Sequence, residues 1–69
     1  MINNRIKIEY YNNYSILQER NYKNEGTIYS IVKGNIDSNL VNGIQIDYSY
    51  FVTIEEAREF IDNLNEDQA

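Results

Sequence analysis

The sequence predicts an α+β fold, an antiparallel β-meander of four to five strands with one C-terminal helix packed on one face. Two observations predict it. Apolar and polar residues alternate through much of the first fifty residues, which is the period of half-buried strands. From residue 54 onward, apolar residues recur every three to four positions, which is the period of a helix with one buried face. A chain of 69 residues is expected to form one small domain over 1–69.

Four strands are predicted, at residues 5–11, 14–20, 27–33 and 44–51, and residues 36–41 are predicted to be either a short edge strand or a loop. The alternation is clear at Ile6, Ile8 and Tyr10, which are separated by Lys7 and Glu9. It is equally clear in the last strand. There the apolar positions are Ile44, Ile46, Tyr48 and Tyr50.

Asparagine and glycine predict the turns between these strands. The signals are Asn12-Asn13, Gly26, Gly34-Asn35 and Asn42-Gly43. Asn12-Asn13 fits a two-residue hairpin, because asparagine tolerates the positive φ values that such a turn requires. Asn42-Gly43 is the strongest hairpin signal of the chain. Gly26 is expected to supply a left-handed conformation at the end of a polar loop.

The helix is predicted over residues 54–64. Thr53 and Glu56 fit a capping box, in which the threonine hydroxyl accepts a backbone N–H and the glutamate reaches back to the N–H of Thr53. One apolar stripe follows, made of Ala57, Phe60, Ile61 and Leu64. The tail from Asn65 to Ala69 is expected to fray.

The sheet face away from the helix is predicted to be apolar and uncovered. Its residues would be Tyr11, Leu17, Tyr29, Ile31 and Phe51. A second copy of the chain or a partner protein would cover such a face. Tyr10, Tyr48 and Tyr50 are instead expected to pack within the sheet.

The whole net charge of −5 lies in the last fifteen residues. Up to Ile54 five acids balance five bases, whereas residues 55–69 hold six acids and one base, Arg58. On a helical wheel, four of these acids point directly away from the apolar stripe. They are Glu55, Glu59, Asp62 and Glu66, with Glu56 and Asp67 at the margins. Arg58 and Asp62 form the one attractive pair at i,i+4 spacing.

Two interpretations of this acidic row follow. It is either a solvated face that keeps a small protein soluble or a surface that engages a basic groove in place of nucleic-acid phosphates. A metal site is disfavoured, because one convex helix face cannot surround a cation with oxygen ligands. Acids in the last turn oppose the helix dipole, so helix stability alone does not explain their placement.

Composition excludes several function classes. The chain has no histidine and no cysteine, which excludes Ser-His and Cys-His nucleophiles, so we expect no enzyme and no cofactor. Six bases and a pI near 4.4 argue against direct nucleic-acid binding. No apolar run is long enough to span a membrane, and no signal-peptide stretch is present, so a cytoplasmic location is expected. The abundance of Asn, Ile and Tyr indicates an AT-rich bacterial, phage or plasmid gene.

The stretch from Phe51 to Ile61, following several strands, resembles the sheet-plus-helix pattern of the small arm-site DNA-binding domains of phage integrases. In those domains an aromatic residue ends a strand, and a helix begins after a threonine, as at Phe51 and Thr53. The resemblance covers about the last forty residues and implies the fold. Those domains bind DNA through a basic sheet, whereas the strand-forming part of this chain is neutral.

The leading hypothesis is a small acidic binding protein, encoded by a phage or mobile element, that inhibits a basic nucleic-acid-handling host protein through its carboxylate row. The first alternative is a structural module that dimerises through its uncovered sheet face, at Tyr11, Leu17, Tyr29 and Ile31. The second is an oligomer that sequesters a small ligand between subunits.

Overall fold

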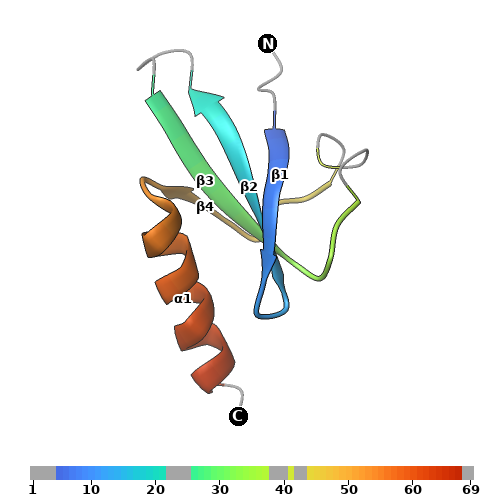
Figure 1. The fold of residues 1–69 in the computed structure, drawn as a ribbon, viewed down its shortest axis with the longest axis vertical. Helices are drawn as coiled ribbons and strands as arrows, with labels where there is room; N and C mark the ends of the chain where they lie inside the picture. The colour runs from blue at the N-terminus through green and yellow to red at the C-terminus, as the bar shows by residue number, and fades with distance from the viewer. Residues whose placement is uncertain (1–4, 22–25, 38–40, 42–43, 68–69) are drawn as a thin grey trace.

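Consecutive strands of the chain pair side by side in one antiparallel sheet (Figure 1). The computed structural model describes residues 5–21, 26–37, 41 and 44–67. Its elements are β1 (Arg5–Tyr11), β2 (Tyr14–Asn21), β3 (Gly26–Lys33), β4 (Tyr48–Phe51) and α1 (Ile54–Asp67). The sheet order is β1-β2-β3-β4, and α1 packs against the sheet. The predicted α+β meander with a C-terminal helix is confirmed.

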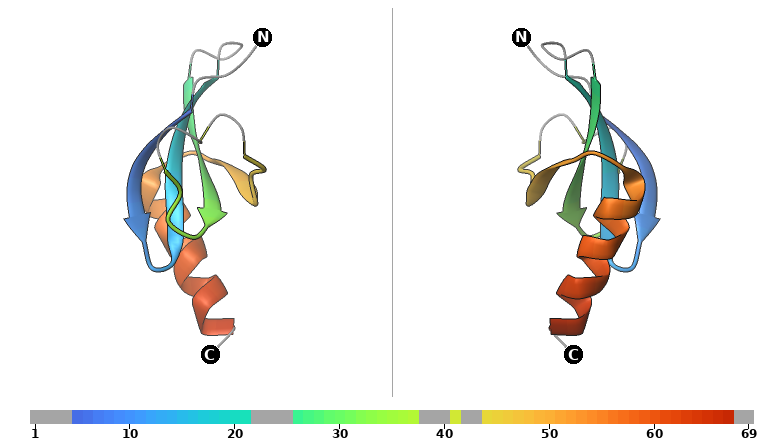
Figure 2. Two further views of the ribbon diagram at one scale, coloured as in Figure 1. Left: turned by 90° about the vertical axis from the view of Figure 1, so that its right-hand side faces the viewer. Right: turned by 90° about the vertical axis from the view of Figure 1, so that its left-hand side faces the viewer.

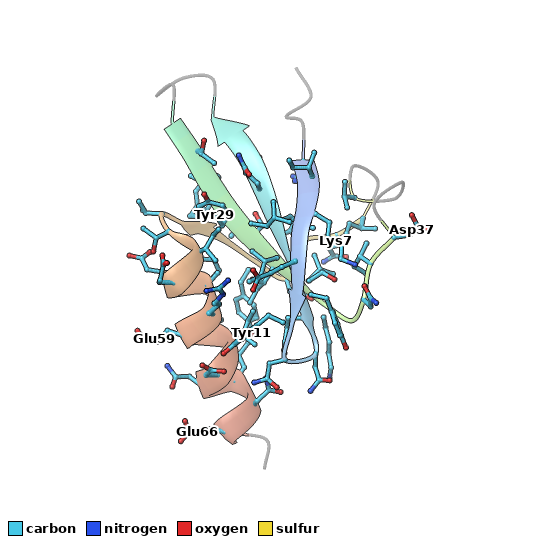
Figure 3. All side chains as sticks on the ribbon, viewed as in Figure 1. Lys7, Tyr11, Tyr29, Asp37, Glu59 and Glu66 are labelled. Atoms are coloured by element: carbon cyan, nitrogen blue, oxygen red, sulfur yellow. The ribbon has the colours of Figure 1, made fainter. Side chains whose placement is uncertain are left out.

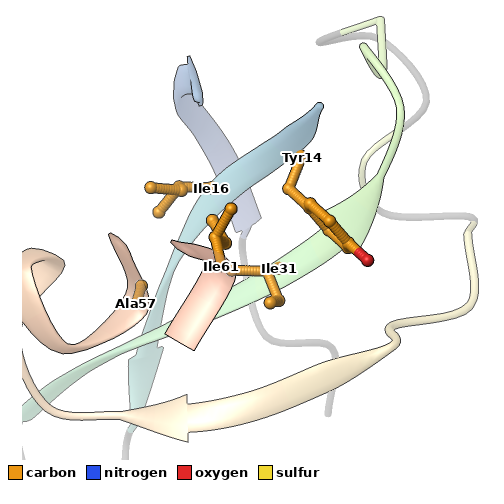
Figure 4. Close-up of a cluster of buried hydrophobic side chains, with 5 residues drawn as sticks. All are labelled: Tyr14, Ile16, Ile31, Ala57 and Ile61. Atoms are coloured by element: carbon orange, nitrogen blue, oxygen red, sulfur yellow. The ribbon is translucent and has the colours of Figure 1, made fainter. Parts of the chain in front are cut away.

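The two faces of the sheet are covered by different parts of the chain. On one face lies the helix-side core, made of Tyr14, Ile16, Ile31, Ala57 and Ile61 (Figure 4). On the other lies the connection-side core, made of Leu17, Val32 and Val41 with Ile36, Ile44 and Ile46 packed against it. In the left panel of Figure 2, the described part of the β3–β4 connection passes in front of the sheet and α1 lies behind it.

A β-bulge in β1 changes which of its side chains face the helix. The register with β2 shifts between Lys7 and Glu9, so that Ile8 is an extra residue of the strand. An extra residue moves all later side chains to the opposite face. Tyr11 therefore packs against the helix-side core, where simple alternation would have placed Tyr10.

The five residues that were predicted to form one uncovered face do not lie on the same face of the sheet. Four of its five residues, Tyr11, Tyr29, Ile31 and Phe51, lie in or against the helix-side core. Leu17 lies on the other face and is 0% exposed, because the β3–β4 connection covers it. The prediction that these residues form one exposed apolar face is wrong.

The last strand is shorter than predicted. β4 begins at Tyr48, so residues 44–47 are not part of the strand. Ile44 and Ile46 pack on the connection side, whereas Tyr48 stacks on Phe60 of α1. The described residues of the segment 36–41 form no strand, and they belong to the connection.

A second bulge lies within β4. Ile31 pairs with Tyr48 and Tyr29 pairs with Phe51, so two steps along β3 match three steps along β4. Tyr50 lies in this bulge with a φ of 71°. A positive φ is uncommon for a bulky residue and costs roughly 1–2 kcal/mol.

The predicted hairpin turn at Asn12-Asn13 is present. Both residues have positive φ values, 48° and 78°, which fit the two-residue turn between paired Tyr11 and Tyr14. Gly26 does not play its predicted part, since it belongs to β3 and pairs with Asn21. Among the described glycines, Gly34 has the left-handed conformation, at the end of β3, with a φ of 96°. The Asn42-Gly43 prediction falls outside the described residues.

The helix begins where the sequence predicts and ends later. The N–H of Glu56 donates to the Thr53 hydroxyl over 3.1 Å, as expected of an N-cap. The Glu56 carboxylate accepts from the N–H of Val52 rather than that of Thr53. Residues 65–67, predicted to fray, are helical. The Asn65 side chain holds this end, because its amide donates to the carbonyls of Asn12 and Ile61.

None of the described residues forms a helix that is long and apolar enough to cross a membrane.

Candidate interaction surface

Three of the predicted acids, which we call the outer acidic face, are Glu55, Glu59 and Glu66. All three side chains are exposed. Glu59 and Glu66 point away from the sheet in Figure 3. None of the three makes a hydrogen bond or an ion pair with another described residue. The helical wheel thus predicts their exposure correctly.

Arg58, the one base of the helix, turns toward the sheet. Its guanidinium donates two hydrogen bonds to Glu9 of β1, over 2.9 and 2.7 Å, and lies 5.8 Å from the ring centre of Tyr11. This bidentate contact lowers the pKa of Glu9 below its ordinary value, with burial opposing the effect. The predicted Arg58–Asp62 pair is wrong. The guanidinium pairs instead with Glu9 on β1, which is far away in the sequence.

Asp62 is exposed but does not point freely outward. Its carboxylate accepts hydrogen bonds from the Tyr11 hydroxyl, over 3.0 and 3.1 Å, and from the Asn12 side-chain amide over 3.1 Å. The hydrogen bond to Asp62 raises the pKa of Tyr11, since ionisation of the phenol would remove the donated proton. Asp62 therefore fastens the helix to the β1–β2 hairpin.

The two marginal acids differ in role as well. Glu56 is exposed and helps to cap the helix through Thr53 and Val52. Asp67 is the last residue of α1, and its side chain lies outside the described part of the structure.

The outer surface of α1 is consequently acidic, although the charge of Arg58 acts on Glu55 at a distance. Arg58 is engaged by Glu9, and the last turn of the helix contains no base. Glu66 lies near the negative end of the helix dipole, where a carboxylate costs a few tenths of a kcal/mol. The position of Glu66 therefore does not serve the stability of the helix.

Comparison with known proteins finds no match. No protein-family model, no curated protein and no solved structure is similar to this chain at a significant level. The function must therefore be argued from the surface itself.

A second surface feature escaped the sequence analysis. Tyr50 in β4 and Val52 in the turn before α1 are 76% and 66% exposed. Tyr50 was predicted to pack within the sheet, and that prediction is wrong. The bulge in β4 interrupts the alternation on which it depended. A tyrosine with a positive φ carries no recognisable signal in a single sequence.

The described residues include no group of three or more carboxylates placed to hold a metal ion.

Proposed function

We propose that this protein is a non-enzymatic binding protein that uses the outer acidic face of α1 to occupy the nucleic-acid site of a basic protein. The observation that carries the proposal is the division of charge on the helix. The one guanidinium is turned toward the sheet and paired with Glu9, while Glu55, Glu59 and Glu66 remain exposed and form no hydrogen bond or ion pair with another described residue.

The dimensions of this face suit such a partner. Glu66 lies eleven positions after Glu55 along the helix, which at ~1.5 Å per residue gives a row of about 16 Å. A nucleic-acid strand presents phosphates as a regular line of negative charge. A basic groove built for phosphates would attract a carboxylate row by the same long-range electrostatics.

The alternatives raised by the sequence gain no support from the described residues. Dimerisation through Tyr11, Leu17, Tyr29 and Ile31 was predicted from a shared exposed face, and these side chains lie on two covered faces. No contact among the described residues favours sequestration of a small ligand between subunits.

The test is a binding assay against a panel of purified basic DNA-binding repressors, nucleases and recombinases. Binding is measured by calorimetry at several salt concentrations, and duplex DNA is added as a competitor. We expect the wild-type chain to bind at least one member, to be displaced by DNA, and to bind more weakly as salt increases.

Two variants of equal net charge show whether binding depends on the outer acidic face or only on the overall charge of the protein. Glu55→Gln/Glu59→Gln/Glu66→Gln changes −5 by three to −2. Asp37→Lys/Gln45→Lys also adds three positive charges, at exposed positions of the β3–β4 connection. The first variant should bind about tenfold more weakly or worse, with a smaller salt dependence, and the second should bind almost as the wild type does. Equal weakening by both variants would show that only net charge matters.

A further inference from the structure

The corner between β4 and α1 carries the most exposed large apolar side chains of the described chain. Tyr50 is 76% exposed and Val52 is 66% exposed. The other exposed apolar residues, Ile6, Tyr10 and Tyr48, range from 43% to 57%. Exposed apolar residues that lie two positions apart on one corner are candidates for contact with a partner.

The ring of Tyr50 belongs to neither of the two cores. Its neighbours Tyr48 and Phe51 both contact the ring of Phe60 at an angle, with 4.7 and 5.2 Å between ring centres, whereas Tyr50 pairs with no described ring. Its φ of 71° is one that glycine or asparagine would adopt more easily. A strained backbone that directs a large ring into solvent favours a role outside the fold.

The corner lies beside the N-terminus of α1, where the outer acidic face begins with Glu55. The N–H of Val52 is bonded to the carboxylate of Glu56, and Glu55 lies in the first turn of α1. Tyrosine combines a rigid apolar ring with a polar tip and is enriched among the residues that dominate protein–protein contacts. A carboxylate rim beside an apolar anchor is complementary to an apolar depression bordered by lysine or arginine.

We propose that Tyr50 and Val52 are the apolar anchor of the partner-binding surface and insert into such a depression on a basic protein. This inference rests on the proposed function and adds to it. The acidic face supplies long-range attraction, and the anchor supplies the short-range contact that slows dissociation.

The experiment uses the panel protein that the wild-type chain binds most tightly. Tyr50→Gly, Tyr50→Asn and Val52→Thr are measured beside Tyr10→Thr, a control at the exposed tyrosine of β1. We expect the Tyr50 variants to bind about tenfold more weakly or worse, and Val52→Thr a few-fold more weakly. The slope of log Kd against log salt should stay unchanged, because no charge is removed. Tyr10→Thr should bind as the wild type does.

Thermal unfolding of the free chains gives a second measurement. Tyr50→Asn relieves the strained φ without the extra unfolded-state entropy that glycine brings, so its Tm should be higher than that of the wild type by about 5 °C. A higher Tm together with weaker binding would show that the tyrosine is kept for the partner. A lower Tm would assign the ring to the fold and overturn the inference.

The remaining outcomes are distinct. Tyr50 variants with wild-type Kd, beside weakened charge variants, would overturn the anchor and leave the proposed function standing. A wild-type chain that binds no basic protein of the panel would overturn the proposed function and this inference with it. Sedimentation that shows a wild-type dimer, lost in Tyr50→Gly, would assign the corner to a second copy of the chain.

Discussion

The two faces of the sheet are protected in different ways. On one face, α1 contributes a regular apolar stripe, with Ala57 and Ile61 fully buried against Ile16 and Ile31. On the other, an irregular connection contributes isolated apolar residues such as Val41. The first layer combines this packing with side-chain contacts such as Arg58–Glu9 and Tyr11–Asp62.

The second layer is held through its own backbone groups as well as by packing. The Ser15 hydroxyl donates to the carbonyl of Gly34 over 2.6 Å and accepts from the N–H of Ile36 over 2.9 Å. The Asp47 carboxylate accepts from the N–H of Lys33, and its own N–H donates to the carbonyl of Ile31. The described residues of this connection form no helix or strand, so their backbone groups must be satisfied by such contacts.

The largest predicted effect is the loss of stability when buried apolar atoms are removed, and this loss should differ between the two layers. Ile61→Ala removes a fully buried side chain from a rigid helix and should cost about 3 kcal/mol. Val41→Ala should cost about 1.5 kcal/mol, because fewer atoms are lost and the irregular connection can collapse around the gap. Urea unfolding followed by circular dichroism measures both values. A Val41→Ala cost as large as that of Ile61→Ala would show that the connection is as rigid as the helix.

An intermediate effect should come from two buried serines on the connection side. Both Ser15 and Ser30 are 0% exposed, but the Ser30 hydroxyl has no hydrogen-bond partner among the described residues. Ser15→Ala should cost about 2 kcal/mol, since it leaves the groups of Gly34 and Ile36 unpaired. Ser30→Ala should be neutral or slightly stabilising, because it removes a buried hydroxyl that is not satisfied. The same urea titration measures both variants. Equal losses of stability would contradict the predicted difference between the two serines.

The smallest effect concerns the ionic contact of the helix layer. Arg58 lowers the pKa of Glu9, so this pair stabilises the folded state above the unfolded-state pKa of about 4.3. The contribution is lost as the pH falls through the lower pKa of the folded state. Glu9→Gln should therefore cost about 1 kcal/mol at pH 7 and almost nothing at pH 2.

Urea midpoints of the wild type and Glu9→Gln between pH 2 and pH 7 measure this difference. A difference that stays constant with pH would show that Glu9 acts by packing rather than by charge. At alkaline pH the raised pKa of Tyr11 has the opposite effect, since stability then falls as the pH rises. The Tyr11–Asp62 contact stabilises the fold below about pH 10 and is lost as the phenol ionises.

The sequence predicts the helix layer well because its signals are local. Thr53 marks the start of the helix, and the stripe through Ala57 and Ile61 marks its buried side. The exposure of Glu55, Glu59 and Glu66 follows from the same periodicity. The contacts of Asp62 could not be predicted, because Tyr11 and Asn12 are about fifty residues away and meet it only in the folded chain.

The sequence fails where a single residue interrupts alternation. The extra residue Ile8 moved Tyr11 to the helix side, and the bulge at Tyr50 released that ring into solvent. Neither residue type marks a bulge, since both are ordinary residues of strands. The covering role of the β3–β4 connection was also missed, because Ile44 and Ile46 alternate with polar residues as a strand does, although β4 begins only at Tyr48.

The two bulges have a consequence for contacts between molecules. β1 and β4 are the outermost strands of the sheet, and each contains one bulge. A regular outer strand offers an uninterrupted row of backbone donors and acceptors to any other extended chain, which is a route to aggregation. In this protein, the bulges at Ile8 and Tyr50 interrupt that row on both edge strands of the sheet. The irregularities that obscured the fold in the sequence thus also discourage the sheet from growing by addition of further strands.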